Sequence, residues 1–256
     1  MKKTTLLLSA LMSLSFAHAA LADDALARVK AAGELKIGTE GTYAPFTFHT
    51  ISGDLTGFDV EIGRAIAQQL HVKPVFVEGK WDGLIAGLDA KRYDVVINEV
   101  GVTPERQKKY DYSTPYIVSK AVVVVKNDNT SIHSFADLKG KNSAQSLTSN
   151  YAQIARQYGA NLVSTDGFNQ SIDLVVQGRA DATVNDKLSF LDFKKHRPDA
   201  PVKIVASEDN ASASAVLLRK DESTLQSAIN DALATIKKDG TYEKISEKYF
   251  GEDVSH

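Results

Sequence analysis

The chain has 256 residues, 24% of them charged and 43% hydrophobic, with a formal net charge of −2 and no cysteine. This balance argues against a nucleic-acid-binding protein and gives no sign of attraction to a membrane surface. The fold cannot contain a disulfide, and the scattered histidine and acidic residues show no metal-ligand spacing. We therefore expect no metal or other cofactor, and stability that comes from core burial alone.

The N-terminal 22 residues have the features of a secretory signal peptide. Lys2 and Lys3 form a basic start, residues 6–16 form a short apolar run, and two small-residue cleavage sites end at Ala19 and Ala22. The run is shorter than the roughly 20 residues that a membrane span needs. We expect cleavage after Ala22, with Ala19 as the other option, and export of the mature chain to the periplasm.

The first part of the mature chain alternates strands and helices. Short β-branched runs predict strands at 35–39, 73–77 and 94–98, and amphipathic stretches predict helices at 58–70 and 82–91. This βαβαβ order indicates an α/β fold with a mostly parallel sheet and helices on both faces.

A second, similar set of units follows. Strands are predicted at 121–126, 162–164, 182–185, 203–206 and 214–219, and helices at 134–139, 150–158, 170–178, 187–196, 222–238 and 242–249. Ligands of open α/β sheets bind beyond the carboxyl ends of strands. Residues 40–43, residues 99–101 and Asp186 all lie at such ends.

The segment 93–116 combines a buried strand, a loop and the start of a helix. Thr103 is a plausible N-cap, and Pro104 follows at the first helical position. Arg106 lies one turn into this helix, where a guanidinium fork and free backbone N–H groups suit a carboxylate. On spacing alone, Arg106 could equally be one more solvated charge beside Lys108 and Lys109.

Six motifs in fixed order carry a family resemblance. They are GTYAPF (41–46), GFDVEI (57–62), WDGLIAGL (81–88), VTPERQKKYDYSTPY (102–116), GRADA (178–182) and KYFG (248–251). Each is weak alone, but together they make residues 23–256 resemble the periplasmic solute-binding proteins of polar amino-acid ABC importers. EGTYAPF, KWDGLIAGLDAKRYDVVIN and YDYSTPY are most similar to the cystine-binding branch.

The resemblance implies a two-lobed Venus-flytrap fold of type II, whose lobes are joined by two hinge strands and close over a ligand. After the signal peptide (1–22), lobe one would comprise 23–116 plus 215–256, and lobe two 117–214. We expect a monomer by default, and a binding protein rather than an enzyme, because the sequence shows no nucleophile paired with a base and no metal or phosphate loop. Such a protein would deliver an L-amino acid to an ABC transporter permease, with cystine or cysteine as the first expectation.

By similarity, Arg106 binds the ligand's α-carboxylate with help from the Gly101 N–H, and Ser149 contributes from the other lobe at a helix N-terminus. Asp186 matches the aspartate that holds the α-ammonium. Plain structural roles are the alternatives: N-caps for Ser149 and Asp186, and a structural glycine at Gly101.

Tyr43 and Trp81 match two aromatic positions that enclose the ligand side chain. Glu40 matches a position that contacts this side chain, where it could recognise a distal ammonium or amide. The alternatives are a surface packing role for Trp81 and a turn role for Glu40. Phe46 and Phe58 are assigned to the core despite their motifs.

Two positions depart from the pattern. Gly101 stands where many relatives carry a side chain with a hydroxyl. Without that hydroxyl, binding of the ammonium depends more on Asp186 and the Thr103 hydroxyl. Glu99 stands where a neutral residue is more common. Beside Asp186 it favours a second positive charge on the ligand or a raised pKa for one of the pair, unless only its carbonyl faces the ligand. Glutamine, histidine, arginine and lysine therefore stay open as ligands.

Two other classes of function compete with transport. Some periplasmic cyclohexadienyl dehydratases resemble this fold, so fold alone does not decide. Such an enzyme needs a general acid, and Glu99 is the one candidate named by the sequence. A sensor that presents its ligand to a separate receptor is the third reading.

Overall fold

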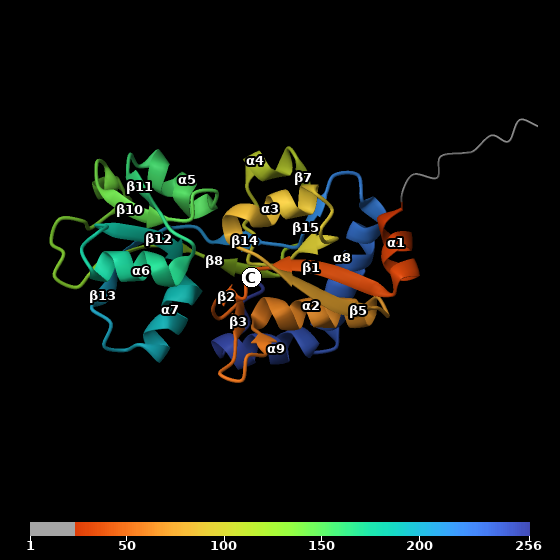
Figure 1. The fold of residues 1–256 in the computed structure, drawn as a ribbon. Helices are drawn as coiled ribbons and strands as arrows, with labels where there is room; N and C mark the ends of the chain where they lie inside the picture. Colours follow the sequence, from red (N-terminus) through yellow and green to blue (C-terminus); the bar gives the residue numbers. More distant parts are fainter. Residues whose placement is uncertain (1–23) are drawn as a thin grey trace, which may run out of the picture.

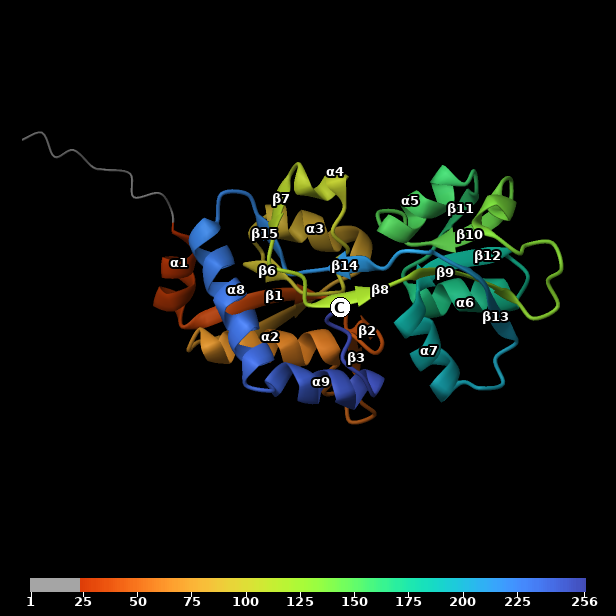
Figure 2. The same ribbon diagram turned by 180° about the vertical axis from the view of Figure 1, so that it is seen from behind.

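The structure is a computed structural model that describes residues 24–256, and the predicted signal peptide lies outside this range. Two α/β lobes lie side by side, joined by two extended segments of chain (Figures 1 and 2). The predicted two-lobed α/β fold is confirmed. Within residues 24–256, no helix has both the length and the apolar character needed to cross a membrane.

The first lobe is built on a five-stranded sheet in the order β5-β1-β6-β15-β7. Its strands are β1 (Glu34–Thr39), β5 (Lys73–Glu78), β6 (Val95–Val96), β7 (Tyr110–Tyr112) and β15 (Leu217–Arg219). One face carries α1 (Ala25–Ala32), α2 (Phe58–Gln69), α8 (Ser223–Lys238) and α9 (Thr241–Phe250). The other face carries α3 (Trp81–Asp89) and α4 (Pro104–Gln107) (Figure 1).

The second lobe repeats this plan with a sheet in the order β11-β10-β12-β9-β13. Its strands are β9 (Ala121–Lys126), β10 (Asn142–Gln145), β11 (Asn161–Ser164), β12 (Ala182–Asp186) and β13 (Val202–Ser207). Its helices are η1 (Phe135–Leu138), α5 (Asn150–Gln157), α6 (Phe168–Val176) and α7 (Lys187–His196).

The prediction of a mostly parallel sheet holds for only part of each sheet. In the first lobe β1 pairs parallel with β5 and β6, but β15 pairs antiparallel with β6 and β7. In the second lobe β9 is antiparallel to both of its neighbours. The physical reason is the chain crossing: β9 and β15 directly follow the passage from one lobe to the other, and each enters its new sheet in the reverse direction.

The two crossing segments pair with each other as the predicted hinge strands. They are β8 (Ile117–Ser119) and β14 (Ser212–Ser214), which run antiparallel. The strand predicted at 214–219 is therefore two strands, β14 in the hinge and β15 in the first lobe. The C-terminal segment lies beside the hinge, where the Val118 N–H donates to the Val254 carbonyl over 2.9 Å (Figure 2).

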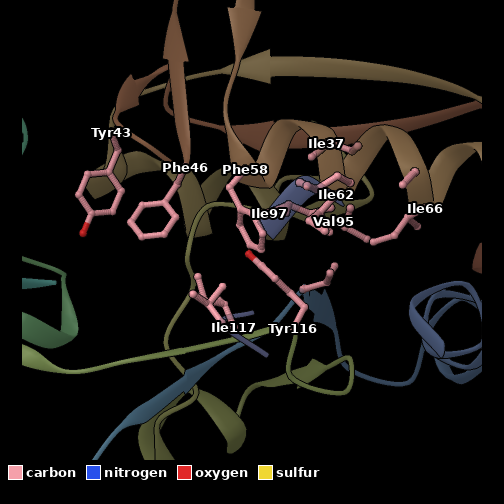
Figure 3. Packing of buried hydrophobic residues seen from close by; sticks show 14 of the residues in the cluster. Ile37, Tyr43, Phe46, Phe58, Ile62, Ile66, Val95, Ile97, Tyr116 and Ile117 are labelled. Atoms are coloured by element: carbon pink, nitrogen blue, oxygen red, sulfur yellow. The ribbon is translucent and has the colours of Figure 1, made fainter. Parts of the chain in front are cut away.

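A three-stranded sheet follows β1 and was not predicted. It consists of β2 (Thr42–Tyr43), β3 (Thr47–His49) and β4 (Leu55–Thr56), too short to show an alternating pattern. The turn between β2 and β3 brings Phe46 into the core and leaves Tyr43 at the end that faces the second lobe (Figure 3).

Phe46 and Phe58 are fully buried, as predicted. The Phe58 ring lies 5.0 Å from the Phe250 ring and 6.1 Å from the Tyr116 ring, measured between centroids. Figure 3 shows Phe58 directed at Tyr116, next to Ile117 of the hinge strand β8. Aromatic packing therefore connects α2, the C-terminal helix and the start of the hinge.

We expect Phe58→Ala to lower the free energy of unfolding by about 3–5 kcal/mol, because it opens a cavity in this aromatic cluster. Urea denaturation followed by circular dichroism measures the change. Ile51→Ala is the matched control, since Ile51 is fully exposed on the β3–β4 loop and should shift stability by no more than about 0.5 kcal/mol. Equal effects of the two substitutions would contradict the assignment of Phe58 to the core.

Candidate functional site

A cleft lies between the lobes, and its empty space of about 450 Å³ is partly open to solvent. Both lobes supply its walls. The first lobe contributes Glu40, Tyr43, Trp81, Asn98 and Glu99, and the second contributes Gln145, Ser146, Ser149, Asn150, Tyr151, Gly167, Phe168, Ser171 and Asn185. Several of these follow strand ends, as expected for a ligand site of an open α/β sheet.

One rim of the cleft is held shut by hydrogen bonds to Asp82 at the start of α3. Its carboxylate accepts from the Thr148 hydroxyl at 2.7 Å, from the Thr148 N–H at 3.0 Å and from the Leu147 N–H at 3.3 Å. On the same rim, Lys80 Nζ lies 2.7 Å from an Asp166 carboxylate oxygen. These bonds join the α3 region of the first lobe to loops of the second.

The opposite rim is closed by different groups. The Tyr43 hydroxyl donates to Asn185 Oδ1 at 2.7 Å, and the Ser189 hydroxyl donates to the Ala44 carbonyl at 2.9 Å. Because both rims carry bonds between the lobes, the structure is in a closed conformation.

Arg106 lies on the short helix α4 next to the first rim. Thr103 caps this helix, as predicted, and its hydroxyl accepts from the Arg106 N–H at 3.2 Å. The Arg106 guanidinium donates to the Gly101 carbonyl at 2.9 Å and to the Thr148 carbonyl at 3.4 Å. It also stacks over the Trp81 ring at 5.3 Å from the centroid, so one face of Trp81 is already covered.

Gly101 and Ser149 lie on opposite sides of the cleft near α5. A Cβ atom at Gly101 would come within 3.2 Å of the Asn150 side chain, so the missing side chain makes room for this amide from the other lobe. The Ser149 hydroxyl accepts from the Ala152 N–H at 3.0 Å and caps α5. The N-terminus of α5 thus reaches the cleft.

Two buried carboxylates from opposite lobes lie near each other at the floor of the cleft: Glu99, which lines it, and Asp186, which directly follows the lining residue Asn185. Glu99 accepts from the Ser214 hydroxyl at 2.9 Å, and Asp186 caps α7 by accepting two backbone N–H groups of its first turn. The Tyr151 hydroxyl lies 3.2 Å from a Glu99 oxygen and 3.5 Å from an Asp186 oxygen. Burial raises the pKa of both carboxyls, and repulsion by Asp186 raises the pKa of Glu99 further.

A third buried carboxylate, Asp59, fixes the backbone of Glu99. Glu99 has a φ of 48°, which is uncommon outside glycine. Its N–H donates to one oxygen of Asp59 at 2.5 Å, and the Tyr116 hydroxyl donates to the other at 3.0 Å. Burial raises the pKa of Asp59 to about 7.

At the far end of the cleft, Glu40 is paired with Asn98. The Asn98 amide donates to the Glu40 carboxylate at 2.7 Å, and the Glu40 N–H donates back to Asn98 Oδ1 at 2.8 Å. Burial raises the pKa of Glu40 to about 7. The buried Trp81 Nε1–H has no hydrogen-bond partner among the described residues.

Of the residues proposed from sequence, five line the cleft: Glu40, Tyr43, Trp81, Glu99 and Ser149. The other four contact the wall or support those contacts: Gly101, Thr103, Arg106 and Asp186.

Sequence reasoning missed Asn98, Gln145, Ser146, Asn150, Tyr151, Gly167, Phe168, Ser171 and Asn185. Asn150 and Tyr151 directly follow Ser149, and Asn98 and Asn185 adjoin Glu99 and Asp186, so their position beside predicted residues was the available signal. Within residues 24–256, no three histidine, aspartate or glutamate side chains are grouped as metal ligands.

Residues 35–252 match the bacterial extracellular solute-binding proteins, family 3. The L-cystine-binding protein TcyA of Bacillus subtilis is 47% identical over 233 residues, covering 91% of this chain and 87% of that protein. An ancestral arginine-binding protein bound to arginine has a TM-score of 0.81 at 40% identity, covering 86% and 99% of the two chains. The unliganded, open L-cystine solute receptor of Neisseria gonorrhoeae has a TM-score of 0.60 at 48% identity, covering 91% and 99%.

The order of these two TM-scores is opposite to the order of identity. The open receptor is more similar in sequence but less similar in structure. The open conformation of that receptor is consistent with this order, because hydrogen bonds close both rims of the cleft in the present structure.

We expect protonation of Glu40 to raise the free energy of unfolding by about 2–3 kcal/mol as the pH falls from 8 to 5. The reason is that the folded carboxyl, with a pKa of about 7, takes up its proton at a higher pH than the unfolded one, with 4.5. Protonation therefore stabilises the folded state, and this contribution is lost as the pH rises through 7. Asp59 acts in the same direction.

Urea denaturation of wild type, Glu40→Gln and Glu105→Gln at pH 5, 6, 7 and 8 measures this contribution. Glu40→Gln should flatten the pH dependence, whereas the exposed Glu105→Gln control should leave it as in wild type. An unchanged slope in Glu40→Gln would contradict the burial argument.

Proposed function

The chain belongs to the bacterial extracellular solute-binding proteins of family 3, and on this premise we propose that its cleft captures L-cystine for delivery to an ABC importer. The predicted membership of the amino-acid-binding family is confirmed. The observation that carries the proposal is the Glu99–Asp186 pair, which has no cationic partner among residues 24–256, in a cleft whose rim holds Arg106. An amino acid supplies the missing ammonium and a carboxylate together.

The α-carboxylate subsite is proposed at Arg106, the Gly101 N–H and the N-terminus of α5. Gly101 and Ser214 face each other in an isolated antiparallel β-bridge. Its two hydrogen bonds are donated by the neighbouring N–H groups of Val102 and Ala215. The Gly101 N–H is not used by the bridge and is left for an anion. Stacking on Trp81 holds the guanidinium at the cleft, and the α5 N–H groups favour negative charge.

The α-ammonium subsite is proposed at Asp186 and Glu99. Asp186 keeps one oxygen on the first turn of α7 and directs the other toward Tyr151 and the cleft floor. A bound ammonium would lie between opposite lobes and pair with a charge from each. It would offset the desolvation of both carboxylates, which no lysine, arginine or histidine of residues 24–256 does by an ion pair.

Cystine carries a second amino-acid head group, and the far end of the cleft has groups to receive it. The Glu40 carboxylate suits a second ammonium, and the unpartnered Trp81 Nε1–H suits a second carboxylate. Tyr43 contributes its ring to the wall between the ends. Arginine or lysine would use Glu40 but leave the indole N–H unpaired, which favours cystine; glutamine and histidine are the remaining alternatives.

The domain boundaries and cellular route belong to the same proposal. Lobe one is assigned to 23–116 plus 215–256, and lobe two to 117–214, so that the boundaries fall on the paired strands β8 and β14. The signal peptide 1–22 would direct the chain to the periplasm, where the monomer would meet its permease.

Calorimetry and Trp81 fluorescence on refolded, ligand-stripped protein test the function. Cystine, cysteine, glutamine, histidine, arginine and lysine are titrated, and we expect the tightest binding for cystine. Tighter binding of arginine or lysine would transfer the assignment to a cationic ligand read by Glu40 or Glu99. No binding of any amino acid would overturn the proposal, and prephenate turnover, lost in Glu99→Gln, would then favour the dehydratase alternative.

We expect Arg106→Ala and Asp186→Ala each to weaken amino-acid binding about 100- to 5,000-fold, since each leaves a ligand charge buried without its partner. Calorimetry measures the dissociation constants. Lys108→Ala is the matched control: this lysine follows α4, is exposed, and should leave affinity unchanged. Normal binding by Arg106→Ala would show that the carboxylate subsite lies elsewhere.

Trp81→Ala should weaken cystine binding by about 2 kcal/mol, roughly 30-fold, because it removes both the ring and its hold on Arg106. Trp81→Phe separates the indole N–H from the ring. It should weaken cystine more than arginine, because only cystine has a second carboxylate for the N–H. Equal losses for the two ligands would contradict the second head-group subsite.

A further inference from the structure

Tyr151 joins the two halves of the closed cleft at its floor. It extends from α5 of the second lobe, and its hydroxyl faces Glu99 of the first lobe at 3.2 Å and Asp186 of its own lobe at 3.5 Å. The exposed fractions of the three residues are 9%, 7% and 1%, so little water shares in these contacts. Neither the proposed function nor the motifs assign a role to Tyr151.

The surroundings of this triad are acidic. Five groups face it: Asp59 on α2, Tyr43 on β2, Tyr116 before β8, the Ser119 hydroxyl on β8 and the Ser214 hydroxyl on β14. No lysine, arginine or histidine of residues 24–256 forms an ion pair with Glu99 or Asp186. Hydrogen bonds from Ser214 and from the first turn of α7 compensate the two carboxylates only in part, so burying both in ionised form without a cation is costly.

The number of available hydrogens also indicates that one of the two carboxyls is protonated in the closed, empty cleft. A tyrosine hydroxyl has one hydrogen, so it can donate to only one of two carboxylates at a time. The other contact becomes a hydrogen bond only if that carboxyl is protonated and donates to the Tyr151 oxygen. Desolvation raises the pKa of both carboxyls, so the closed, empty cleft holds such a shared proton more tightly than two solvated carboxylates would.

We propose that one proton held by the Glu99–Tyr151–Asp186 triad takes the place of the ligand's ammonium and allows the empty lobes to close. Tyr151 is then a positioning residue, which carries the bond between the lobes. This inference rests on the proposed function, because the ammonium is assigned to the same two carboxylates. It goes further in predicting that closure without ligand is favoured by acid, whereas closure with ligand does not need the proton.

The sign of the linkage follows from the two forms of the protein. In the open form Glu99 and Asp186 are separated, so the closed, empty form binds the proton more tightly. Lowering the pH from 8 to 5 therefore shifts the empty protein toward the closed form. An amino acid supplies its own positive charge, so at pH 8 it closes the lobes without the proton.

Small-angle X-ray scattering on ligand-stripped full mature chain tests the proposal at pH 8 and pH 5, with and without saturating amino acid. We expect the radius of gyration of the empty wild type to fall toward the liganded value at pH 5. Glu99→Gln, which needs no proton, should give the same radius at both pH values. Tyr151→Phe should lose the acid-induced decrease. Glu105→Gln is the control, since it removes an exposed carboxyl outside the cleft, and it should retain the wild-type shift.

The outcomes separate this inference from the function on which it rests. If the wild-type radius of gyration is equal at pH 8 and pH 5 but falls on adding an amino acid, the proposed role of the proton is wrong and the proposed function stands. A full acid shift in Glu99→Gln also overturns it, because another group would then hold the proton. If Tyr151→Phe fails to fold by circular dichroism, Glu99→Gln alone decides. No change with any amino acid at either pH counts against the proposed function itself.

Discussion

The fully buried Asp59 carboxylate is the fixed point on which both the cleft and the hinge depend. It lies in the first turn of α2, where the helix N-terminus favours negative charge. One oxygen holds the Glu99 N–H and thereby the unusual φ of that residue, and the other holds the Tyr116 hydroxyl at the entry to the hinge. The carboxylate of the first lobe is thus set relative to the point about which the second lobe turns. Strain at Glu99 persists because its surroundings determine it, and it falls where a ligand group is expected.

Helix N-caps perform two tasks in this protein. Thr103, Ser149 and Asp186 each satisfy backbone N–H groups at the start of a helix. Ser149 lines the cleft, and Asp186 directly follows the lining residue Asn185. The structural and the ligand-binding readings of these residues are therefore compatible. Asp186 shows why: one oxygen serves α7 while the other remains on the cleft floor. A carboxylate anchored in this way keeps its position when the lobes open, so the site is preorganised on each lobe separately.

The sequence predicts whatever depends on neighbouring residues and fails where distant segments meet. The helices at 58–70 and 187–196, the Thr103 cap and the burial of Phe46 and Phe58 all follow from local pattern, and the structure contains them. Motif spacing located the ligand candidates near strand ends. Two-residue strands such as β6, the antiparallel entry of β9 and β15, and the break between β14 and β15 depend on tertiary pairing. Tyr151 and Asn185 were missed because their partners, Glu99 and Tyr43, are 52 and 142 residues away in sequence.

The free energy of closure must come mainly from the centre of the cleft. At the rim, the Lys80–Asp166 pair has both side chains about two-thirds exposed, and such pairs contribute about 0–1 kcal/mol. The Asp82 bonds are likewise exposed, and each replaces a bond to water. The centre is different, because Glu99 and Asp186 lose their water on closing and oppose each other. Rim bonds of this strength align the two lobes but do not overcome the repulsion between Glu99 and Asp186. Whatever positive charge enters between the two carboxylates, an ammonium or a proton, therefore decides whether the lobes close.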